Sequence, residues 1–228
     1  MSRRLILIRH GQTHYNATRR MQGQLDTELS GTGREQARVA AGKLAGAGIR
    51  RIVSSDLSRA RDTAELIAQE LGLDVTVDDR LRETHLGQWQ ARTHQEVDTA
   101  LPGARATWRH DATWAPPGGE SRVEVARRAR PVVDELMASY TGWDGGAVLF
   151  VAHGGAISAL TSSLLELDVS MYPMFSGLKN TRWAQLTARP RYYPGSHDAH
   201  DEVDAPSVQF TPGNVGDAQW YLDGWNMG

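Results

Sequence analysis

The chain has 228 residues, a length that allows a sizeable core and favours one domain over two. Its 25 basic and 27 acidic side chains give a formal net charge of -2, so no overall positive field exists to attract nucleic acid or an anionic membrane. The absence of cysteine excludes disulfides, thiolate metal sites and cysteine nucleophiles, and because neither a signal peptide nor an apolar run of ~20 residues is present, we expect a cytoplasmic protein.

The opening segment predicts a buried strand that ends at a ligand site. Leu5–Ile8 is a short apolar run that leads into Arg9-His10-Gly11, and ligands of open α/β sheets bind at the carboxyl ends of strands. A buried guanidinium costs stability unless an anion arrives, and arginine prefers bidentate partners such as phosphate. We therefore expect a phosphate pocket, to which Thr13 and Asn16 add short hydrogen-bonding side chains. The alternative is a structural histidine that caps the strand.

A helix and a second strand follow, and they bring in another arginine. Thr32 and Glu35 form a capping box that predicts a helix start, and Ile52–Ser55 predicts a strand. If Ser58 begins the next helix, Arg59 lies in its first turn, where free backbone N–H groups already favour an anion. Because cations usually occupy the other end of a helix, a ligand explains Arg59 better than helix stability does, and a solvated arginine is the alternative.

The middle of the chain predicts a small strand, an irregular region and a helix. Val75–Val77 is the strand, and residues 95–117 contain tryptophans and a Pro-Pro pair that indicate a lid, so we place a cap over the site at about residues 90–118. Ser121 and Glu124 form another capping box, and the apolar stripe after them predicts a helix packed on the core.

The segment Ala147–Ala152 predicts the most buried strand of the chain. It repeats the pattern of the opening segment, in which an apolar strand is followed by a histidine and a glycine. It ends in His153-Gly154, and a helix follows from about Ala156 to Leu167. Two strands that both end in histidine and glycine would place two imidazoles in one crevice if they are neighbours.

The tail predicts a strand at Thr181–Leu186 and an edge strand at Gln219–Trp225. Residues 189–217 lie between them, and a hairpin, a second lid or a contact surface explains so long a segment better than coil does. Five side chains there are metal-ligand types, namely His197, Asp198, His200, Asp201 and Glu202. Their spacing matches no recognised metal motif, so a solvated polar loop is the preferred interpretation.

Five side chains would form a phosphoryl-transfer site if they converge: Arg9, His10, Arg59, Glu83 and His153. A neutral imidazole is a competent nucleophile, and the cations would stabilise charge on the transferred group without a metal. A carboxylic acid such as Glu83 could protonate the leaving oxygen and then take a proton from water. For Glu83 alone, a salt bridge to Arg80 or Arg82 is the simpler interpretation.

Four ordered motifs together resemble the histidine phosphatase superfamily, the phosphoglycerate mutase-like proteins, over nearly the whole chain. They are residues 9–13, residues 54–60, Glu83-x-x-x-Gly87-x-Trp89, and His153-Gly154. The resemblance implies one domain over residues 1–228, an α/β fold with a mixed, mostly parallel sheet flanked by helices on both faces, and a cap over the site, with lid segments at about 90–118 and 189–217. It implies no metal or other cofactor and a small phosphorylated molecule as substrate.

The resemblance also implies roles for individual residues. His10 matches the phosphorylated nucleophile, Glu83 matches the proton donor, and the phosphate pocket is matched by Arg9, Arg59, His153 and Asn16. Gly154 follows the second histidine, and we count it with Thr13 among the substrate-binding residues. Gly87-x-Trp89 is similar to the phosphatases of the family rather than to the mutases. These phosphatases usually have a glycine two residues after the tryptophan, where this chain has Ala91.

Further segments resemble a subgroup of the family that dephosphorylates glucosyl-3-phosphoglycerate. They are residues 21–30, 80–87, 111–116 and 222–226, and by this resemblance Gln22 would contact the substrate. The alternatives are a broad-specificity histidine phosphatase, a phosphoglycerate mutase, and a phosphate-binding module without catalysis. A homodimer is the default expectation for the assembly.

Overall fold

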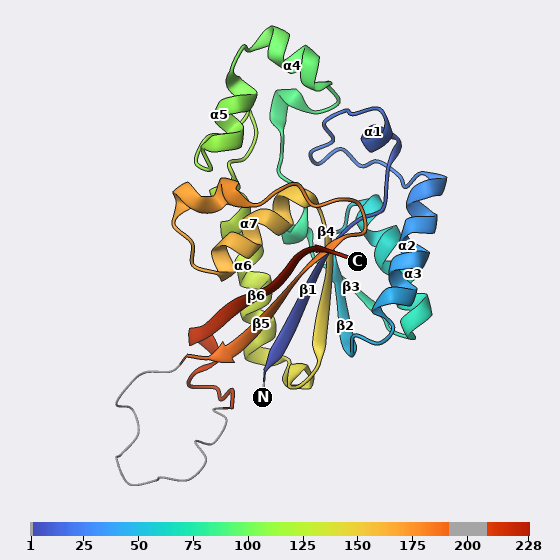
Figure 1. Ribbon diagram of the computed structural model, residues 1–228, viewed down its shortest axis with the longest axis vertical. Coiled ribbons are helices and arrows are strands. Elements are labelled where there is room, and N and C mark those ends of the chain that lie inside the picture. Colours follow the sequence, from blue (N-terminus) through green and yellow to red (C-terminus); the bar gives the residue numbers. More distant parts are fainter. Residues whose placement is uncertain (1, 192–208) are drawn as a thin grey trace.

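The computed structural model describes residues 2–191 and 209–228, and a mixed sheet runs through it (Figure 1). Its strands are β1 (Arg3–Arg9), β2 (Ile49–Ser54), β3 (Val75–Val77), β4 (Ala147–Ala152), β5 (Trp183–Pro190) and β6 (Ala218–Met227). They lie in the order β3-β2-β4-β1-β5-β6; the first four are parallel and the last two are antiparallel to their neighbours. The expected mixed, mostly parallel α/β sheet is confirmed.

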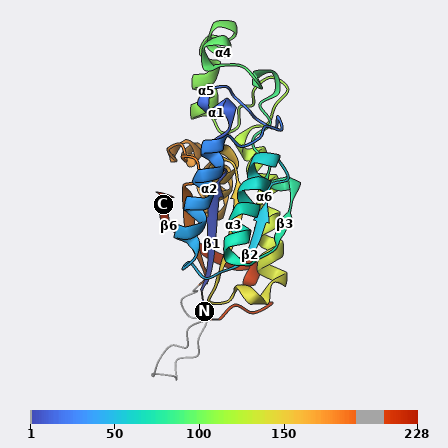
Figure 2. The same cartoon turned by 90° about the vertical axis from the view of Figure 1, so that its right-hand side faces the viewer.

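Helices cover both faces of this sheet, as Figure 2 shows from the side. They are α1 (His14–Ala17), α2 (Gly31–Leu44), α3 (Ser58–Leu71), α4 (His94–Ala100), α5 (Ala104–His110), α6 (Arg122–Ser139) and α7 (Gly154–Leu164), with short 3-10 turns at Asp79–Leu81, Gly87–Trp89, Thr141–Trp143, Val169–Met174 and Val215–Asp217. Helices α2 and α3 pack on one face, and α6 and α7 pack on the other. In the part of the chain that is described, no helix has the length and apolarity needed to cross a membrane.

The middle of β1, Leu5–Ile8, and the whole of β4 are apolar because both faces of these two central strands are buried. Along β1, Leu5 and Leu7 belong to the core on the side of α6 and α7, whereas Ile6 and Ile8 belong to the core on the side of α2 and α3. Side chains alternate between the faces of a strand, so a continuous apolar run fills both cores. These strands are the most deeply buried part of the described chain.

The register of β1 and β4 brings the two predicted histidines together. Arg9 is paired with Ala152 in the parallel ladder, so the next residue of each strand emerges at the same edge of the sheet. Those residues are His10 and His153, and the expectation that the two strands are neighbours whose histidines lie side by side is confirmed.

The capping predictions have mixed outcomes. The box of Ser121 and Glu124 at the start of α6 is confirmed, but the box predicted at Thr32 is wrong because α2 begins two residues earlier than an N-cap at Thr32 requires. Its N-cap is Ser30, whose Oγ accepts a hydrogen bond from the N–H of Gly33 at 3.1 Å. Gly33 packs against the backbone of Gln12 without room for a Cβ, and this contact holds the start of α2 against the segment that carries His10.

Residues 95–117 are more regular than predicted, because α4 and α5 lie within them or reach into them. The missed signal is a capping box of Thr93 and Glu96, which begins α4. In Figure 1 these helices and α1 stand beyond the carboxyl ends of the central strands. That residues 90–118 act as a cap stays a prediction.

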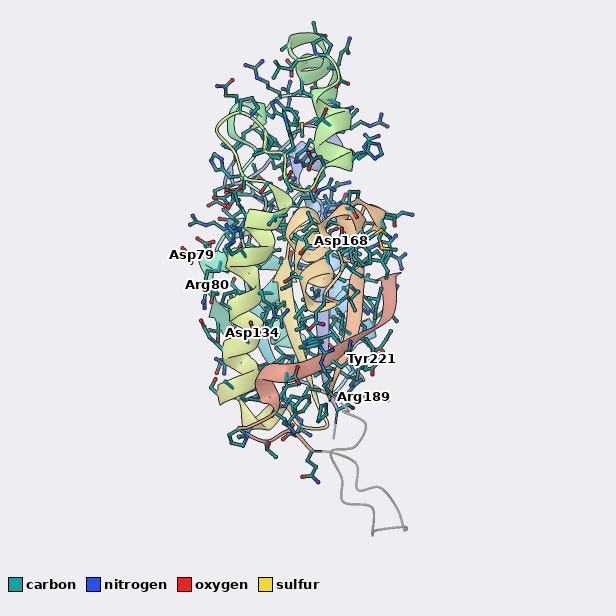
Figure 3. The ribbon with its side chains drawn as sticks, turned by 90° about the vertical axis from the view of Figure 1, so that its left-hand side faces the viewer. Asp79, Arg80, Asp134, Asp168, Arg189 and Tyr221 are labelled. Atoms are coloured by element: carbon teal, nitrogen blue, oxygen red, sulfur yellow. The ribbon has the colours of Figure 1, made fainter. Side chains whose placement is uncertain are left out.

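The tail contains both predicted strands, with shifted bounds. β5 begins at Trp183 and extends to Pro190, four residues beyond the predicted end, and β6 is the edge strand, as expected. On its outer side, the guanidinium of Arg189 lies 5.6 Å from the ring centre of Tyr221 (Figure 3). The loop with His197 and His200 falls within residues 192–208, outside the described residues.

Candidate active site

His10 is a buried, neutral imidazole at the end of β1, and its side chain is ready to act as a nucleophile. The residue is 2% exposed, and its Nδ1 lies 2.6 Å from the carbonyl oxygen of Gly11. A carbonyl can only accept, so Nδ1 carries the hydrogen and Nε2 keeps its lone pair. Burial, and then the charges of Arg59 and Arg9, hold the pKa of His10 well below 6.5.

Arg59 lies in the first turn of α3, as predicted, and its guanidinium is fixed against His10. Nε donates to Nε2 of His10 at 3.3 Å, while the two terminal nitrogens donate at 2.7 Å to the carbonyls of Gly23 and Leu25. The side chain has no solvent exposure, and burial lowers its pKa to about 10, so it stays charged at neutral pH. A buried cation with only neutral acceptors favours an anion beside it.

Arg9 completes the cationic side of the site. One terminal nitrogen donates to the carbonyl of Leu178 at 2.6 Å, which ties the guanidinium to the loop before β5. Its Nε is buried and has no hydrogen-bond partner among the described residues. Burial lowers the pKa of Arg9, with the charge of Glu83 acting in the opposite direction. An oxyanion would satisfy this donor.

His153 follows β4, and its ring centre lies 5.1 Å from that of His10 at a tilt of 59°. Its Nε2 is 3.0 Å from Oγ of Ser55, which itself accepts from the N–H of Leu57. The hydroxyl hydrogen can therefore point to Nε2, and this leaves the imidazole hydrogen on Nδ1, a buried atom without a partner in the described chain. Burial and the nearby cations hold the pKa of His153 well below 6.5.

Asn16 and Gln22 face the site with amide groups whose oxygens are already occupied. Oδ1 of Asn16 accepts from the N–H of Thr13 at 3.1 Å and from Asn180 at 3.2 Å. Oε1 of Gln22 accepts from the hydroxyls of Thr13 and Thr27 at 2.8 and 2.6 Å. Each side chain therefore keeps its NH₂ group for a ligand. Thr13, which we expected to bind substrate, caps α1 and orients these two amides instead of lining the cleft.

Glu83 is held at the start of α7 by backbone N–H groups. Gly155 and Ala156 each donate to its carboxylate at 3.1 Å, and Thr84 donates at 2.8 Å. A Cβ on Gly155 would lie 2.5 Å from Oε1 of Glu83, so the glycine permits this approach. Gly154 lines the cleft beside Arg9, as a neighbour of the reacting groups.

The alternative of a salt bridge from Glu83 to Arg80 or Arg82 is excluded, because other acids occupy both arginines. Arg80 pairs with Asp78 at 2.7 Å and with Glu135 at 2.6 Å, and Arg82 pairs with Asp56. Figure 3 shows Arg80 on the outside of the molecule beside α6. Glu83 is thus free to serve the cleft.

The cleft has two compartments that meet at Glu83. The inner compartment has a volume of about 340 Å³ and is lined by Arg9, His10, Asn16, Arg19, Arg20, Met21, Gln22, Gly23, Arg59, Glu83, Thr84, Leu86, His94, Trp108 and Gly155. The outer compartment, of about 680 Å³, adds Arg109, Arg122, Gly154, Ser158 and residues 173–178. The inner one is sized for a phosphoryl group with part of its alcohol, and the outer one extends beyond Glu83, away from His10.

Sequence reasoning missed the residues on the outer rim of this cleft. They are Arg19, Arg20, His94, Trp108, Arg109 and Arg122, and they come from the segment that follows α1, from α4 and α5, and from the start of α6. None belongs to a motif with a fixed spacing. The one available signal is that arginines and a tryptophan recur in the segment expected to form a lid.

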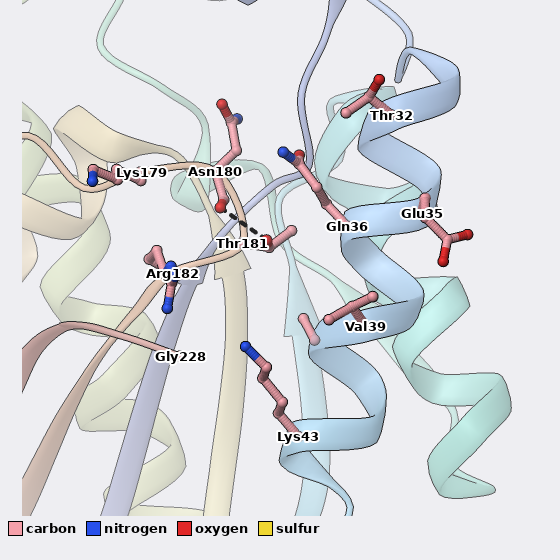
Figure 4. A pocket seen from close by; sticks show the side chains of 11 residues that line it. Thr32, Glu35, Gln36, Val39, Lys43, Lys179, Asn180, Thr181, Arg182 and Gly228 are labelled. Atoms are coloured by element: carbon pink, nitrogen blue, oxygen red, sulfur yellow. Dashed lines mark hydrogen bonds between the residues drawn. The ribbon is translucent and has the colours of Figure 1, made fainter.

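Another hollow, of about 630 Å³, lies between α2 and the loop that precedes β5 (Figure 4). Neither His10 nor Glu83 opens onto it. Its walls support the site from behind, since Gln36 accepts from the backbone N–H of Gln12 and Asn180 donates to the carbonyl of His10. The walls of this hollow therefore help to position the segment that carries His10.

The described residues contain no group of three or more histidines, aspartates and glutamates that could hold a metal ion. The metal alternative raised by His197 and His200 concerns residues outside the described part of the chain.

Comparison with known proteins agrees with the motifs. The model of the histidine phosphatase superfamily (branch 1) matches residues 5–193. The glucosyl-3-phosphoglycerate phosphatase of Mycolicibacterium vanbaalenii is 51% identical over 228 residues, which cover 98% of this chain and 94% of that protein. The native structure of a mycobacterial glucosyl-3-phosphoglycerate phosphatase matches with a TM-score of 0.87 and 48% identity over 100% of both chains. The complex of that enzyme with inorganic phosphate gives 0.82 and 48%, over 98% of this chain and 97% of the other.

Proposed function

Since this chain belongs to the histidine phosphatase superfamily and is a phosphatase of that type, we propose that it hydrolyses glucosyl-3-phosphoglycerate through a phosphohistidine at His10. The observation that carries the mechanism is the set of N–H donors near Nε2 of His10, the ring nitrogen that carries no hydrogen. Arg59 donates to this atom, Arg9 and His153 have buried N–H groups without a partner among the described residues, and Asn16 and Gln22 add amide groups to the lining of the cleft.

In the first step, Nε2 of His10 attacks phosphorus as the bond from phosphorus to the alcohol oxygen breaks. Arg59, which donates to Nε2 in the free protein, transfers this hydrogen bond to the incoming phosphoryl group. Charge on the equatorial oxygens is stabilised by the two arginines and by Nδ1–H of His153. Glu83 gives its proton to the leaving oxygen, which becomes a neutral alcohol.

In the second step, Glu83 takes a proton from water as the water oxygen attacks the phosphohistidine. The nitrogen–phosphorus bond breaks, inorganic phosphate leaves, and both His10 and Glu83 return to their starting states. Backbone donors from α7 hold the carboxylate in one place for both transfers.

The substrate is inferred from the whole-chain identity of about half to relatives that are named for this activity. Two features of the cleft fit that inference: the inner compartment has room for a phosphoryl group, and the outer compartment offers space for a large alcohol. The products would be glucosylglycerate and phosphate. A second copy of the chain as partner and a cytoplasmic location stay predictions.

The test measures phosphate release from glucosyl-3-phosphoglycerate, 3-phosphoglycerate and an aryl phosphate, at matched concentrations and with EDTA present. We expect a preference of about 100-fold for the glucosylated substrate, equivalent to ~2.7 kcal/mol in the transition state. His10→Ala should lower the rate by at least ~10⁴-fold and abolish labelling of the protein by a radiolabelled phosphoryl group. His110→Ala, at the end of α5, is the matched control.

Each alternative gives a distinct outcome. Equal rates on the three substrates would indicate a broad-specificity phosphatase. An isomerised phosphoglycerate in place of free phosphate would indicate a mutase. A phosphoester that binds without labelling His10 would indicate a binding module.

A further inference from the structure

We propose that Arg122, at the start of α6, binds a carboxylate of the leaving group in the outer compartment and thereby selects phosphorylated hydroxy acids over neutral alcohol phosphates. The inference rests on the proposed function, because it names the part of the substrate that this compartment recognises. It assigns a specificity-determining residue that none of the sequence motifs includes.

The first observation is that Arg122 lacks an acidic partner among the described residues, whereas two other half-buried arginines of the same helix have one. Arg128 pairs with Glu120 at 2.9 Å, and Arg130 pairs with Asp134 at 2.7 Å. Arg122 has one hydrogen bond, from a terminal nitrogen to the carbonyl of Arg109 at 3.1 Å. The other N–H groups of its guanidinium are available to a ligand.

The second observation is that this unpaired guanidinium is fixed in a half-buried place. It lies 5.2 Å from the ring centre of Trp108, which provides a flat surface for it to stack on. Burial lowers the pKa of Arg122, and the charge of Glu83 acts in the opposite direction. The guanidinium is therefore close enough to Glu83, the proposed proton donor, for the two charges to interact. A cation that has lost solvent and found no counter-ion favours an anionic ligand.

The third observation is the position of Arg122 relative to the reaction. The leaving oxygen must lie opposite His10 and within reach of Glu83, so the rest of the alcohol extends from Glu83 into the outer compartment. Arg9 and Arg109 also line that compartment, and together with Arg122 they outnumber Glu83, the one acidic residue among its lining residues within the described chain. A carboxylate two bonds from the carbon that bears the phosphate would meet Arg122 there.

The test compares two substrates that differ in one group: 3-phosphoglycerate, which has the carboxylate, and glycerol 3-phosphate, which lacks it. We expect the wild-type protein to prefer 3-phosphoglycerate in kcat/KM, and Arg122→Gln to reduce that preference about 10- to 100-fold, the worth of a charge-assisted hydrogen bond. The rate on an aryl phosphate should change less than about threefold. Arg122→Lys should restore part of the preference, because it keeps the charge but not the stacked plane.

Two control variants make the outcome decisive. Arg127→Gln removes the same charge from an exposed position on α6 and should leave the preference unchanged. Arg19→Gln removes an exposed cation of the inner compartment; if it abolishes the preference and Arg122→Gln does not, the proposal is wrong. Equal losses on all substrates in Arg122→Gln would also overturn it, since they would indicate a structural role.

The same comparison separates the two proposals. If the wild-type protein does not hydrolyse glucosyl-3-phosphoglycerate but Arg122 still sets the preference for the carboxylate, the proposed substrate is wrong and the proposed carboxylate subsite is supported. If glucosyl-3-phosphoglycerate is the substrate and Arg122→Gln keeps the full preference, the subsite is wrong. Calorimetric binding of both phosphates to His10→Ala, with and without Arg122→Gln, gives this result even where turnover is slow.

Discussion

The floor and the rim of the cleft are built by different parts of the molecule. The floor consists of His10, Arg59 and His153, each at most 2% exposed and each carried by the ends of β1 and β4 or by the first turn of α3. The rim consists of side chains such as Arg19, which follows α1, and Arg122, which ends the segment that runs through α4 and α5 to α6. Helices α1 and α5 bury no residue at all.

The two regions also rest on different cores. The strands under the floor belong to the two large clusters on the faces of the sheet. The rim rests on a separate small cluster of Met21, Leu86, Trp89 and Val97, on which Trp108 and Trp114 pack. Under the proposed function, the residues that act on the phosphate therefore rest on the two large cores, whereas the residues that would contact the rest of the substrate rest on a smaller, peripheral cluster.

The largest effect is expected from a substitution that displaces the carboxylate of Glu83, which lies beside the floor of the cleft. Gly155→Ala places a Cβ only 2.5 Å from Oε1 of Glu83. This distance is too short for a carbon and an oxygen that are not bonded, so the carboxylate must move. We expect kcat to fall by about 10²-fold or more on an alkyl phosphate, whose leaving oxygen needs a proton. An aryl phosphate, with a better leaving group, should lose less than about tenfold.

The matched control is the preceding residue. A Cβ on Gly154 would make an ordinary contact, 3.6 Å from Cδ of Arg9, so Gly154→Ala should keep most of the activity. If both variants lose the same activity on both substrates, the loss results from a general disturbance of the start of α7. The contact between residue 155 and Glu83 would then not explain the lower kcat.

The burial of the floor should also appear in the pH dependence of stability. His10 and His153 have pKa values well below 6.5 in the folded state, because burial and nearby cations oppose protonation, whereas the unfolded chain protonates them near 6.5. Below pH 6.5 the unfolded state thus binds more protons, so the free energy of unfolding falls as the pH falls. The slope is about 1.4 kcal/mol per pH unit for each histidine, or about 2.7 for the pair.

Urea unfolding at pH 7.5, 6.5 and 5.5 measures this slope. His153→Asn should reduce it by about half, and the exposed His110→Asn should leave it unchanged. An unchanged slope in His153→Asn would mean that the histidine is protonated in the folded state too, and would remove the basis for a neutral pocket.

The contrast between floor and rim explains what the sequence predicts well. His10, Arg59 and His153 follow from strand ends and a helix start, because apolar runs and parallel pairing fix where such residues meet. Arg122 could not be predicted, since its contact with Trp108 depends on how α5 packs against α6. The partners of Thr13 could not be predicted for a related reason: residue type indicates a hydrogen bond but not its partner, and here the partners are Gln22 and Asn16.

The smallest predicted effect concerns the turn that connects the floor to the rim. Ala91, at the position where related phosphatases usually have glycine, adopts a left-handed backbone with φ of 67°. Its N–H donates to the carbonyl of Met21 at 2.8 Å, and its carbonyl accepts from Arg20 at 2.8 Å, so the turn is retained in spite of the Cβ. Ala91→Gly should therefore raise the free energy of unfolding by about 1 kcal/mol, measured by urea unfolding, without a change in kcat.

The control is Ala106→Gly, on the exposed side of α5, which should lower the free energy of unfolding by a similar amount because glycine is unfavourable inside a helix. If Ala91→Gly lowers stability as well, the left-handed turn costs nothing in this chain, and the rim is held more firmly to the floor than its few contacts imply.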